Sequence, residues 1–245
     1  MTHTWASIRS EAKQTYIGYV WWLLDPLMFI AVYYVVFALI LGSKTEDFVV
    51  FLIIGILAYQ WFQSGIMQGA ATIHNAGGLI KRIRLSKELF PLSKTLHSTW
   101  QFLFVFIVYS LVIYIFFGET PSSHLIAIPF IMLVQLSIIA GITLTLAALY
   151  PFFPDIKHVL QPILRAFLFL SGIFFPASKV PEDLRFYFFL NPMANLIEAY
   201  RDVMLRQQWP DFQSLAVVLM AGLILSFLGI RLIHRFDSDY AKVIP

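Results

Sequence analysis

Six long apolar stretches limit what this chain can fold into. A helix needs about 17–25 predominantly apolar residues to cross the hydrocarbon core of a bilayer. No water is present there to pair with the backbone, so a helix that satisfies its own N–H and C=O groups is the expected form. We therefore predict an all-α integral membrane protein with six transmembrane helices. The predicted spans are residues 20–41, 48–67, 100–117, 125–149, 159–175 and 215–233.

The charge content supports lipid as the main solvent. Charged residues make up 13% of the 245 residues, compared with roughly 25% in soluble domains. A chain this poor in charge cannot cover a globule with polar surface. We therefore attribute the net charge of +3 to cationic cytoplasmic loops rather than to nucleic-acid binding. The sequence has no cysteine, which excludes a disulfide scaffold and thiolate metal sites.

The positions of Lys and Arg predict the orientation in the membrane. If the N-terminus is cytoplasmic, the inner segments hold eleven Lys and Arg residues and the outer segments hold five, with Arg165 inside a span. An even number of spans then places both termini in the cytoplasm. Residues 1–14 lack a short apolar core with a small-residue cleavage site, so we expect no cleaved signal peptide.

Residues 68–99, on the predicted cytoplasmic side, are too many and too charged for a simple turn, and residues 75–94 hold all of their Lys, Arg and Glu side chains. Within them, Leu79–Phe90 mixes apolar and basic side chains and predicts a short basic helix. Such a helix either lies on anionic lipid headgroups or docks a cytoplasmic partner. The residues assigned to its contact surface are Leu79, Lys81, Arg82, Ile83, Arg84 and Leu85.

Residues 176–214, on the predicted outer side, contain two hydrophobic pieces that are each too short to span. The first begins at Pro181 before two acids, and the second begins with Asn191 and Pro192, an N-cap followed by proline at the first helical position. We predict two short re-entrant helices that line or cover a wet cavity, because irregular backbone at that depth needs protein or water around it. One solvated or paired face of the second helix is expected to hold Glu198, Arg201 and Asp202.

The first predicted span carries aromatic side chains at two depths. Trp21 and Trp22 fit an aromatic belt at the cytoplasmic boundary. Tyr33 and Tyr34 lie about midway, where such a belt does not explain them. Aromatic faces stack on sugar rings, so these residues suit a carbohydrate path, and packing between helices is the alternative interpretation.

Two ionisable residues lie inside or near the edge of the first and fifth spans. Asp25 and Arg165 each cost several kcal/mol in lipid unless they meet water or a partner. Arg165 either snorkels to the inner headgroups or faces a pore and meets an anionic substrate. Pro154 and Pro162 would interrupt the fifth span or its approach, and discontinuous helices often mark transport paths.

Motifs for covalent chemistry are missing from the sequence. It has no GxxxxGK[ST] phosphate loop, so the chain is not expected to hydrolyse nucleotide alone. It has no HExxH pair, and its six histidines are scattered, so no metal site is predicted. Ser64 and Ser171 lack the preceding glycine of a nucleophile elbow. We therefore assign no catalytic residue, and a membrane-embedded enzyme or a non-transporting anchor stays as the alternative to transport.

The sequence resembles the ABC-2 type transmembrane subunits that export polysaccharides, the permeases for capsule, teichoic acid and the O-antigen of lipopolysaccharide. Residues Tyr16–Phe37, YIGYVWWLLDPLMFIAVYYVVF, are similar to the family's Gly-x-x-Trp-x-x-x-Glu-Pro opening, with Asp25 in place of Glu. Residues Phe152–Pro176 are similar to its fifth span. Residues Asn191–Leu205, NPMANLIEAYRDVML, are similar to its Asn-Pro … Glu-x-x-Arg-Asp segment.

One position departs from the family pattern. Many members have Arg-Asp before the fifth span, where this chain has Pro154 and Asp155. Some capsule-type members also have proline there, so the departure favours a capsule-like exporter. Export of a small drug or lipid by the same architecture is the alternative.

The resemblance implies a half-transporter of the cell inner membrane. Two copies would form a homodimer with a channel between them and would join two copies of a separate ATPase. That partner would hold ATP and Mg, and this chain would carry no cofactor. The substrate would be a lipid-linked glycan that enters from the inner leaflet, with periplasmic export components as further partners.

The resemblance also implies roles for particular segments. Residues 1–19 would hold an amphipathic interface helix, Leu79–Phe90 would be the coupling helix for the ATPase, and the outer helices would gate the exit. The first and fifth spans would line the channel through Trp21, Trp22, Asp25, Tyr33, Tyr34, Arg165 and Phe169. The outer gate would include Asn191, Pro192, Glu198, Arg201 and Asp202.

Overall fold

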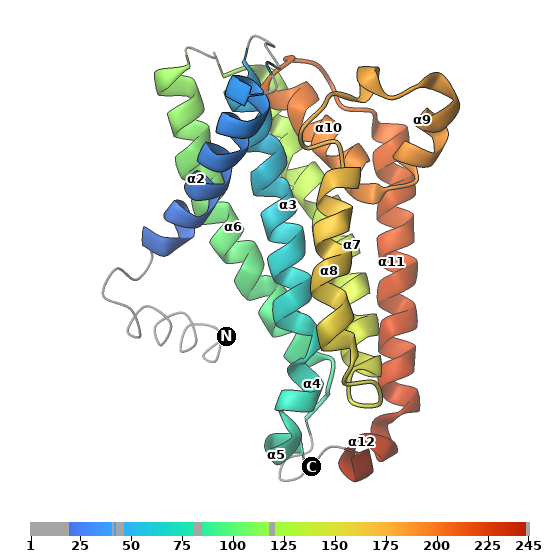
Figure 1. The fold of residues 1–245 in the computed structure, drawn as a ribbon. Coiled ribbons are helices and arrows are strands. Elements are labelled where there is room, and N and C mark those ends of the chain that lie inside the picture. Colours follow the sequence, from blue (N-terminus) through green and yellow to red (C-terminus); the bar gives the residue numbers. More distant parts are fainter. Residues whose placement is uncertain (1–19, 41, 43–46, 81–84, 118–120, 244–245) are drawn as a thin grey trace.

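A computed structural model describes residues 20–40, 42, 47–80, 85–117 and 121–243. Within these ranges every regular element is a helix, and Figure 1 shows long helices packed side by side with short helices at both ends. The long elements are α2 (Val20–Tyr34) with its π-helical continuation η1 (Val35–Ile40), α3 (Phe48–Ala70), α6 (Leu89–Phe116), α7 (Ile128–Leu149), α8 (Ile156–Leu170) and α11 (Phe212–Arg235). The short ones are α4 (Thr72–Asn75), α5 (Gly77–Ile80), η2 (Ser123–Ala127), η3 (Ala177–Lys179), α9 (Glu182–Phe189), α10 (Pro192–Met204) and α12 (Asp237–Val243).

Five of the described helical segments are long and apolar enough to cross a membrane. They begin at Val20, Phe48, Leu89, Ser123 and Phe212. The remaining predicted span, over residues 159–175, is occupied by α8, which has 15 residues. At 1.5 Å per residue it is about 22 Å long, shorter than a hydrocarbon core of about 30 Å.

Helix α8 ends before the apolar sequence does. Its last helical residue is Leu170, and the chain then turns at Gly172, whose φ of 69° lies in the left-handed region that favours glycine. The predicted boundary at residue 175 was therefore wrong by five residues. This turn leads the chain back over the end of the bundle into α9 and α10 (Figure 1).

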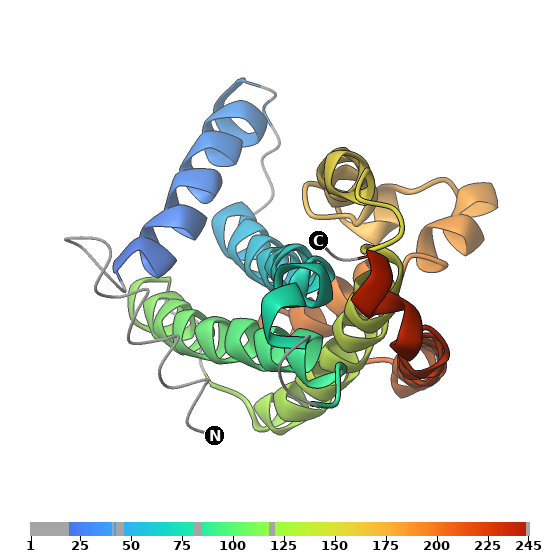
Figure 2. The same cartoon turned by 90° about the horizontal axis from the view of Figure 1, so that it is seen from below.

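Helix α3 forms the centre of the bundle. It contacts α2, α6, α7, α8 and α10, and most of its residues are buried. Figure 2 shows α3 surrounded by these neighbours. The helix is apolar on nearly all sides, as expected for a helix that packs against protein in every direction.

Small residues bring α7 and α11 into close contact. A Cβ atom on Gly222 would lie 2.3 Å from the Ser137 hydroxyl and 2.8 Å from the Ile138 nitrogen. A Cβ atom on Gly141 would lie 2.8 Å from the Gly222 carbonyl oxygen. Membrane helices commonly pack through such small residues because lipid tails give no hydrophobic gain from association.

Helix α11 begins with a side-chain cap. The Asp211 carboxylate accepts hydrogen bonds from the backbone N–H of Gln213 at 3.0 Å and from the Ser214 hydroxyl at 2.5 Å. These bonds, the Ser214 hydroxyl first, lower the pKa of Asp211 below its ordinary value. A carboxylate at a helix N-terminus also interacts favourably with the helix dipole.

Candidate functional site

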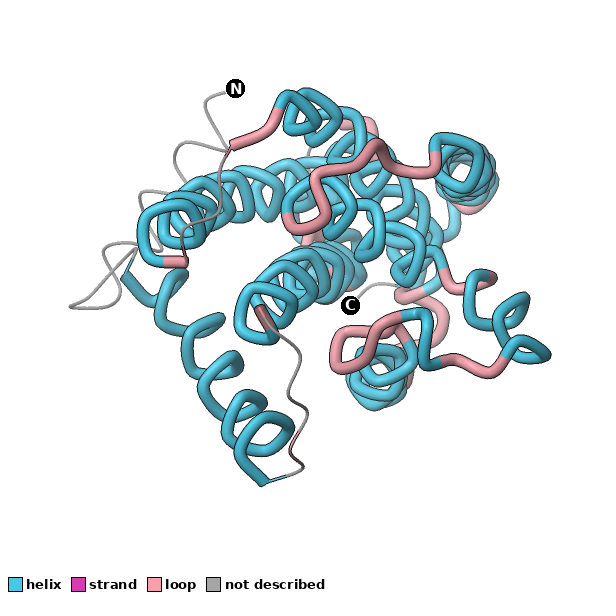
Figure 3. The backbone as a smooth tube through the Cα atoms, turned by 90° about the horizontal axis from the view of Figure 1, so that it is seen from above, coloured by secondary structure: helices cyan, strands magenta, loops and turns pink. Residues whose placement is uncertain are grey.

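Helices α2 and α8 lie on the same side of α3, and α6 and α7 lie on the other side (Figure 2 and Figure 3). Helix α8 is held against α3 by a hydrogen bond from the Tyr59 hydroxyl to the Leu164 carbonyl and by the stacking of Phe62 on Phe167 at 6.2 Å. Leu164 is also the one buried residue among the 15 of α8. Most of α8 is therefore open on the surface of the single chain.

The open surface of α8 includes a polar row. Lys157, Gln161 and Arg165 are exposed and are spaced four residues apart, which puts them on one face of the helix. A row of cations and an amide is costly against lipid. This face therefore needs water or a protein partner in front of it, or lipid headgroups within reach of its cations.

An aromatic cluster joins the C-terminal part of α2 to the turn after α8. The ring centroids of Tyr33 and Phe174 are 4.5 Å apart, and Phe37 stacks on Phe174 at 4.7 Å. Phe169 lies 5.3 Å from Phe174, and Phe29 stacks on Tyr33 at 6.2 Å. Two predicted channel residues, Tyr33 and Phe169, are thus linked through Phe174, which was not predicted as a site residue.

The other predicted aromatic residues of α2 are more widely placed. Trp21 is exposed, and Tyr34 is half-buried. Trp22 turns into the bundle, where its ring lies edge-on to Phe104 of α6 at 6.2 Å. Trp22 therefore belongs with Asp25 in a pocket on the inner side of α2.

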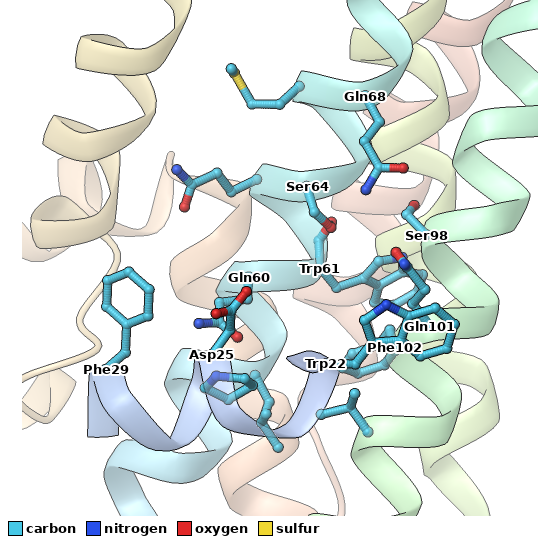
Figure 4. Close-up of a pocket in the computed structure, with 15 residues that line it drawn as sticks. Trp22, Asp25, Phe29, Gln60, Trp61, Ser64, Gln68, Ser98, Gln101 and Phe102 are labelled. Atoms are coloured by element: carbon cyan, nitrogen blue, oxygen red, sulfur yellow. The ribbon is translucent and has the colours of Figure 1, made fainter. Parts of the chain in front are cut away.

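This pocket lies between α2, α3 and α6 and has a volume of about 400 Å³. Figure 4 shows its side chains: α2 supplies Asp25 and Phe29 on one side, and α3 and α6 supply most of the rest. Seven polar residues line it, far more than an apolar helix interface requires. They are Asp25, Gln60, Gln63, Ser64, Gln68, Ser98 and Gln101.

Most of the pocket was not predicted from the sequence. Of its polar residues, Asp25 alone was predicted to contact substrate. The signal that could have revealed others is the spacing of Gln60, Ser64 and Gln68, which are four apart in an otherwise apolar stretch and so form a polar stripe on α3. Their convergence with Gln101 depends on how α3 packs against α6.

Several polar groups of the pocket are available for a ligand. Among the described residues, the side chains of Asp25, Gln60 and Gln101 form no hydrogen bond or ion pair. The indole nitrogen of Trp61 is buried and also has no partner there, while its ring stacks on Phe102 at 4.3 Å. A sugar hydroxyl or a water molecule in the pocket could pair with the side chains of Asp25, Gln60 and Gln101.

Arg201 of α10 is completely buried and pairs with Glu198, so of the two predicted alternatives, a solvated or a paired face, the structure favours the paired one. Its guanidinium donates to the carbonyl oxygens of Gly172 at 2.8 Å and Ile173 at 3.0 Å, and to the Glu198 carboxylate at 3.0 Å. It also lies 3.3 Å from the centroid of the Phe51 ring. The side chain turns inward because these acceptors, two of them in the turn after α8, bind its two terminal guanidinium nitrogens.

The rest of the predicted outer group is paired. Asn191 caps α10 as predicted, because its side-chain oxygen accepts from the Met193 nitrogen at 2.9 Å, and Pro192 follows at the first helical position. Its amide nitrogen donates to the Leu170 carbonyl at 3.1 Å. Glu198 and Asp202 form ion pairs with Arg206 at 2.8 and 2.6 Å. Asn191 and Arg201 together therefore fix the end of α8.

The predicted basic helix Leu79–Phe90 is not continuous. Helix α5 ends at Ile80, residues 85–88 are not helical, and α6 begins at Leu89. The break occurs where Lys87 turns inward and pairs with the Asp237 carboxylate of α12. Leu85 is exposed, whereas Lys81, Arg82, Ile83, Arg84, the Leu79 side chain and residues 1–19 lie outside the described part of the chain.

A bundle of membrane-length helices defines a multi-pass membrane protein. The chain belongs to the ABC-2 type transporter family, whose sequence model matches residues 1–205. The family resemblance inferred from the sequence motifs is therefore confirmed. Family membership makes the chain a transport subunit.

Relatives are similar over nearly the whole chain. An O-antigen export system permease protein RfbA from Myxococcus xanthus is 22% identical over 97% of this chain and 92% of its own length. A protein of the same name from Klebsiella pneumoniae is 25% identical over 97% of this chain and 91% of its own length. The polysialic acid transport protein KpsM from Escherichia coli is 25% identical over 92% of this chain and 88% of its own length.

Proposed function

We propose that this chain is the permease subunit of an ATP-driven exporter that moves a lipid-linked polysaccharide, such as a capsular or O-antigen-like glycan, across the cell inner membrane. The observation that carries the proposal is near full-length similarity to relatives named for O-antigen export and polysialic acid transport. The polar and aromatic groups of α2, α3 and α8 suit a hydrated sugar chain better than lipid.

The channel in this proposal lies between two copies of the chain. The polar row of α8, Lys157, Gln161 and Arg165, is exposed in the single chain and needs a cover that a second copy would supply. Helix α8 counts as a sixth, shortened span. Helices α9 and α10 are then re-entrant and form the outer gate, with Arg201 and Asn191 fastening them to α8.

The driving force in this proposal comes from two copies of a separate ATPase, which holds ATP and Mg. The segment from α5 to the start of α6 would receive its movement, and the N-terminal residues 1–19 would lie on the inner surface. Both termini are then cytoplasmic, as the distribution of Lys and Arg predicts. The ion pair between Lys87 and Asp237 would link that coupling segment to α12.

Inactivation of the gene in its source organism tests this function. The proposal predicts loss of a surface polysaccharide and accumulation of the same glycan, still on its lipid anchor, inside the cell. The gene on a plasmid should restore export. The contradicting result is a normal cell surface together with increased sensitivity to a small drug, which would favour the alternative exporter of drugs or lipids.

A further inference from the structure

The pocket between α2, α3 and α6 has the chemistry of a carbohydrate site. Gln60 and Gln101 each offer an amide that donates and accepts hydrogen bonds, as a sugar hydroxyl does. Trp61 lines the pocket with its indole ring. Phe29 adds an exposed aromatic face. The volume of about 400 Å³ lies in the usual range for small-ligand pockets.

The lining of the pocket has a negative charge and no positive one. Asp25 is the one charged residue among the described residues that line it, and no Lys or Arg is present. A like charge close to Asp25 would be repelled, the more so where surrounding lipid and protein lower the dielectric constant. A sugar that carries a carboxylate or a phosphate would therefore bind poorly.

Helix packing alone does not explain the pocket. Polar groups that face each other across an apolar interface normally pair, because an unpaired one costs free energy in a water-poor environment. Asp25, Gln60 and Gln101 have no such pair among the described residues. Their side chains are thus available to form hydrogen bonds with whatever occupies the pocket between the helices.

The pocket is continuous with the proposed glycan path. Phe29 lines the pocket and also stacks on Tyr33 of the aromatic cluster at 6.2 Å. Through this pair, a chain of rings leads from Asp25 to the turn after α8. A sugar unit in the pocket would therefore lie next to the surface along which the rest of the glycan moves.

We propose that this pocket is a glycan subsite within each protomer and that it takes an uncharged sugar unit. The inference rests on the proposed export of a polysaccharide and narrows its substrate class. It assigns hydrogen-bonding roles to Gln60 and Gln101 and gives Asp25 the role of discriminating against anionic sugars.

Binding of short oligosaccharides to the full chain in lipid nanodiscs tests the subsite. The probes are neutral tetrasaccharides of glucose, galactose and mannose, with tetrasialic acid as the anionic probe. Saturation-transfer NMR should detect binding of at least one neutral probe. The chain should bind that probe more tightly than tetrasialic acid. Gln60→Leu and Gln101→Leu should each weaken that binding at least fivefold, the loss expected from one hydrogen bond of about 1 kcal/mol.

Two further variants complete the test. Gln213→Leu, at the exposed start of α11 outside the pocket, should bind like the wild type. Asp25→Asn keeps the size of the side chain and should raise the affinity for tetrasialic acid at least fivefold relative to the neutral probe. Because this change is a gain, it cannot result from misfolding.

Three results would each overturn the subsite: no neutral probe binds, the glutamine variants bind like Gln213→Leu, or tetrasialic acid binds more tightly to the wild type. Water as the sole occupant of the pocket would give the first result. If glycan export still depends on the gene while any of these results is found, the subsite is wrong and the proposed function stands.

Discussion

Arg201 brings a full positive charge into the interior of the bundle, and its neighbours offset the cost. Two carbonyl oxygens from the turn after α8, the Glu198 carboxylate and the Phe51 ring surround the guanidinium. A charge placed there without these partners would be strongly destabilising. The room for it depends on Gly55, where a Cβ atom would lie 2.9 Å from a guanidinium nitrogen.

Replacing Arg201 should therefore destabilise the protein much more than replacing its exposed neighbour. Arg201→Ala leaves two carbonyl groups of the turn after α8 without this donor and removes one of the two cations paired with Glu198, and we expect a loss of about 2–4 kcal/mol in the free energy of unfolding. Arg206→Ala removes a half-exposed ion-pair partner of the same Glu198 and should cost about 1 kcal/mol or less. Unfolding of the two variants in detergent micelles measures this difference, and equal losses would contradict the account.

At residue scale, the sequence identified the important side chains more reliably than it predicted their orientation. The motif containing Glu198, Arg201 and Asp202 was noted, but charges three and four residues apart normally mark an exposed helix face. Arg201 points inward because α8 ends nearby and the turn after it presents the carbonyl groups of Gly172 and Ile173. That end is a tertiary feature, so the local sequence of α10 does not reveal it.

The helices themselves differ in how they are held. Helix α11 packs along α7 through Gly141, Gly222 and Gly229, where backbones approach too closely for a side chain. Helix α8 has almost no such packing and is fixed at its end by α10. The molecule thus combines a tightly packed pair with a loosely packed helix on the opposite side of α3 from α6 and α7.

Adding one methyl group at the α7–α11 contact should separate the pair. Gly222→Ala would place a Cβ atom 2.8 Å from the backbone nitrogen of Ile138, which cannot move aside like a flexible side chain. We expect a loss of about 1–3 kcal/mol in the free energy of unfolding. The neighbouring Ala221 is exposed, so Ala221→Leu should leave the stability almost unchanged, and a larger loss for Ala221→Leu would refute this packing.

At element scale, apolar length predicted the long helices well because lipid imposes it. The predicted spans over residues 48–67 and 215–233 fall within α3 and α11. The end of α8 at Leu170 was not predicted, because glycine is common inside membrane helices and Gly172 lies in a continuous apolar run. The start of α6 at Leu89 was also missed, since the charged segment before residue 100 looked like a loop.

At the scale of the whole molecule, the single chain is an incomplete structure in this account. The polar row of α8 and the aromatic cluster of α2 lie on one side, with no described element in front of α8. The family resemblance predicted channel residues in α2 and α8. It did not predict the polar pocket, whose residues come from three helices. Such a pocket depends on packing that no single span encodes.

The most direct test of the central claim is whether the polar face of α8 meets water in the assembled transporter. The chain has no cysteine, so Gln161→Cys, Arg165→Cys and Leu228→Cys each introduce a single thiol. Leu228 is 48% exposed on α11 and serves as the control that faces lipid. A charged thiol reagent applied to membranes that contain the full transporter should modify the thiols at positions 161 and 165 at least tenfold faster than the thiol at 228. Equal, slow modification at all three positions would show that α8 faces lipid and would contradict a water-filled channel along it.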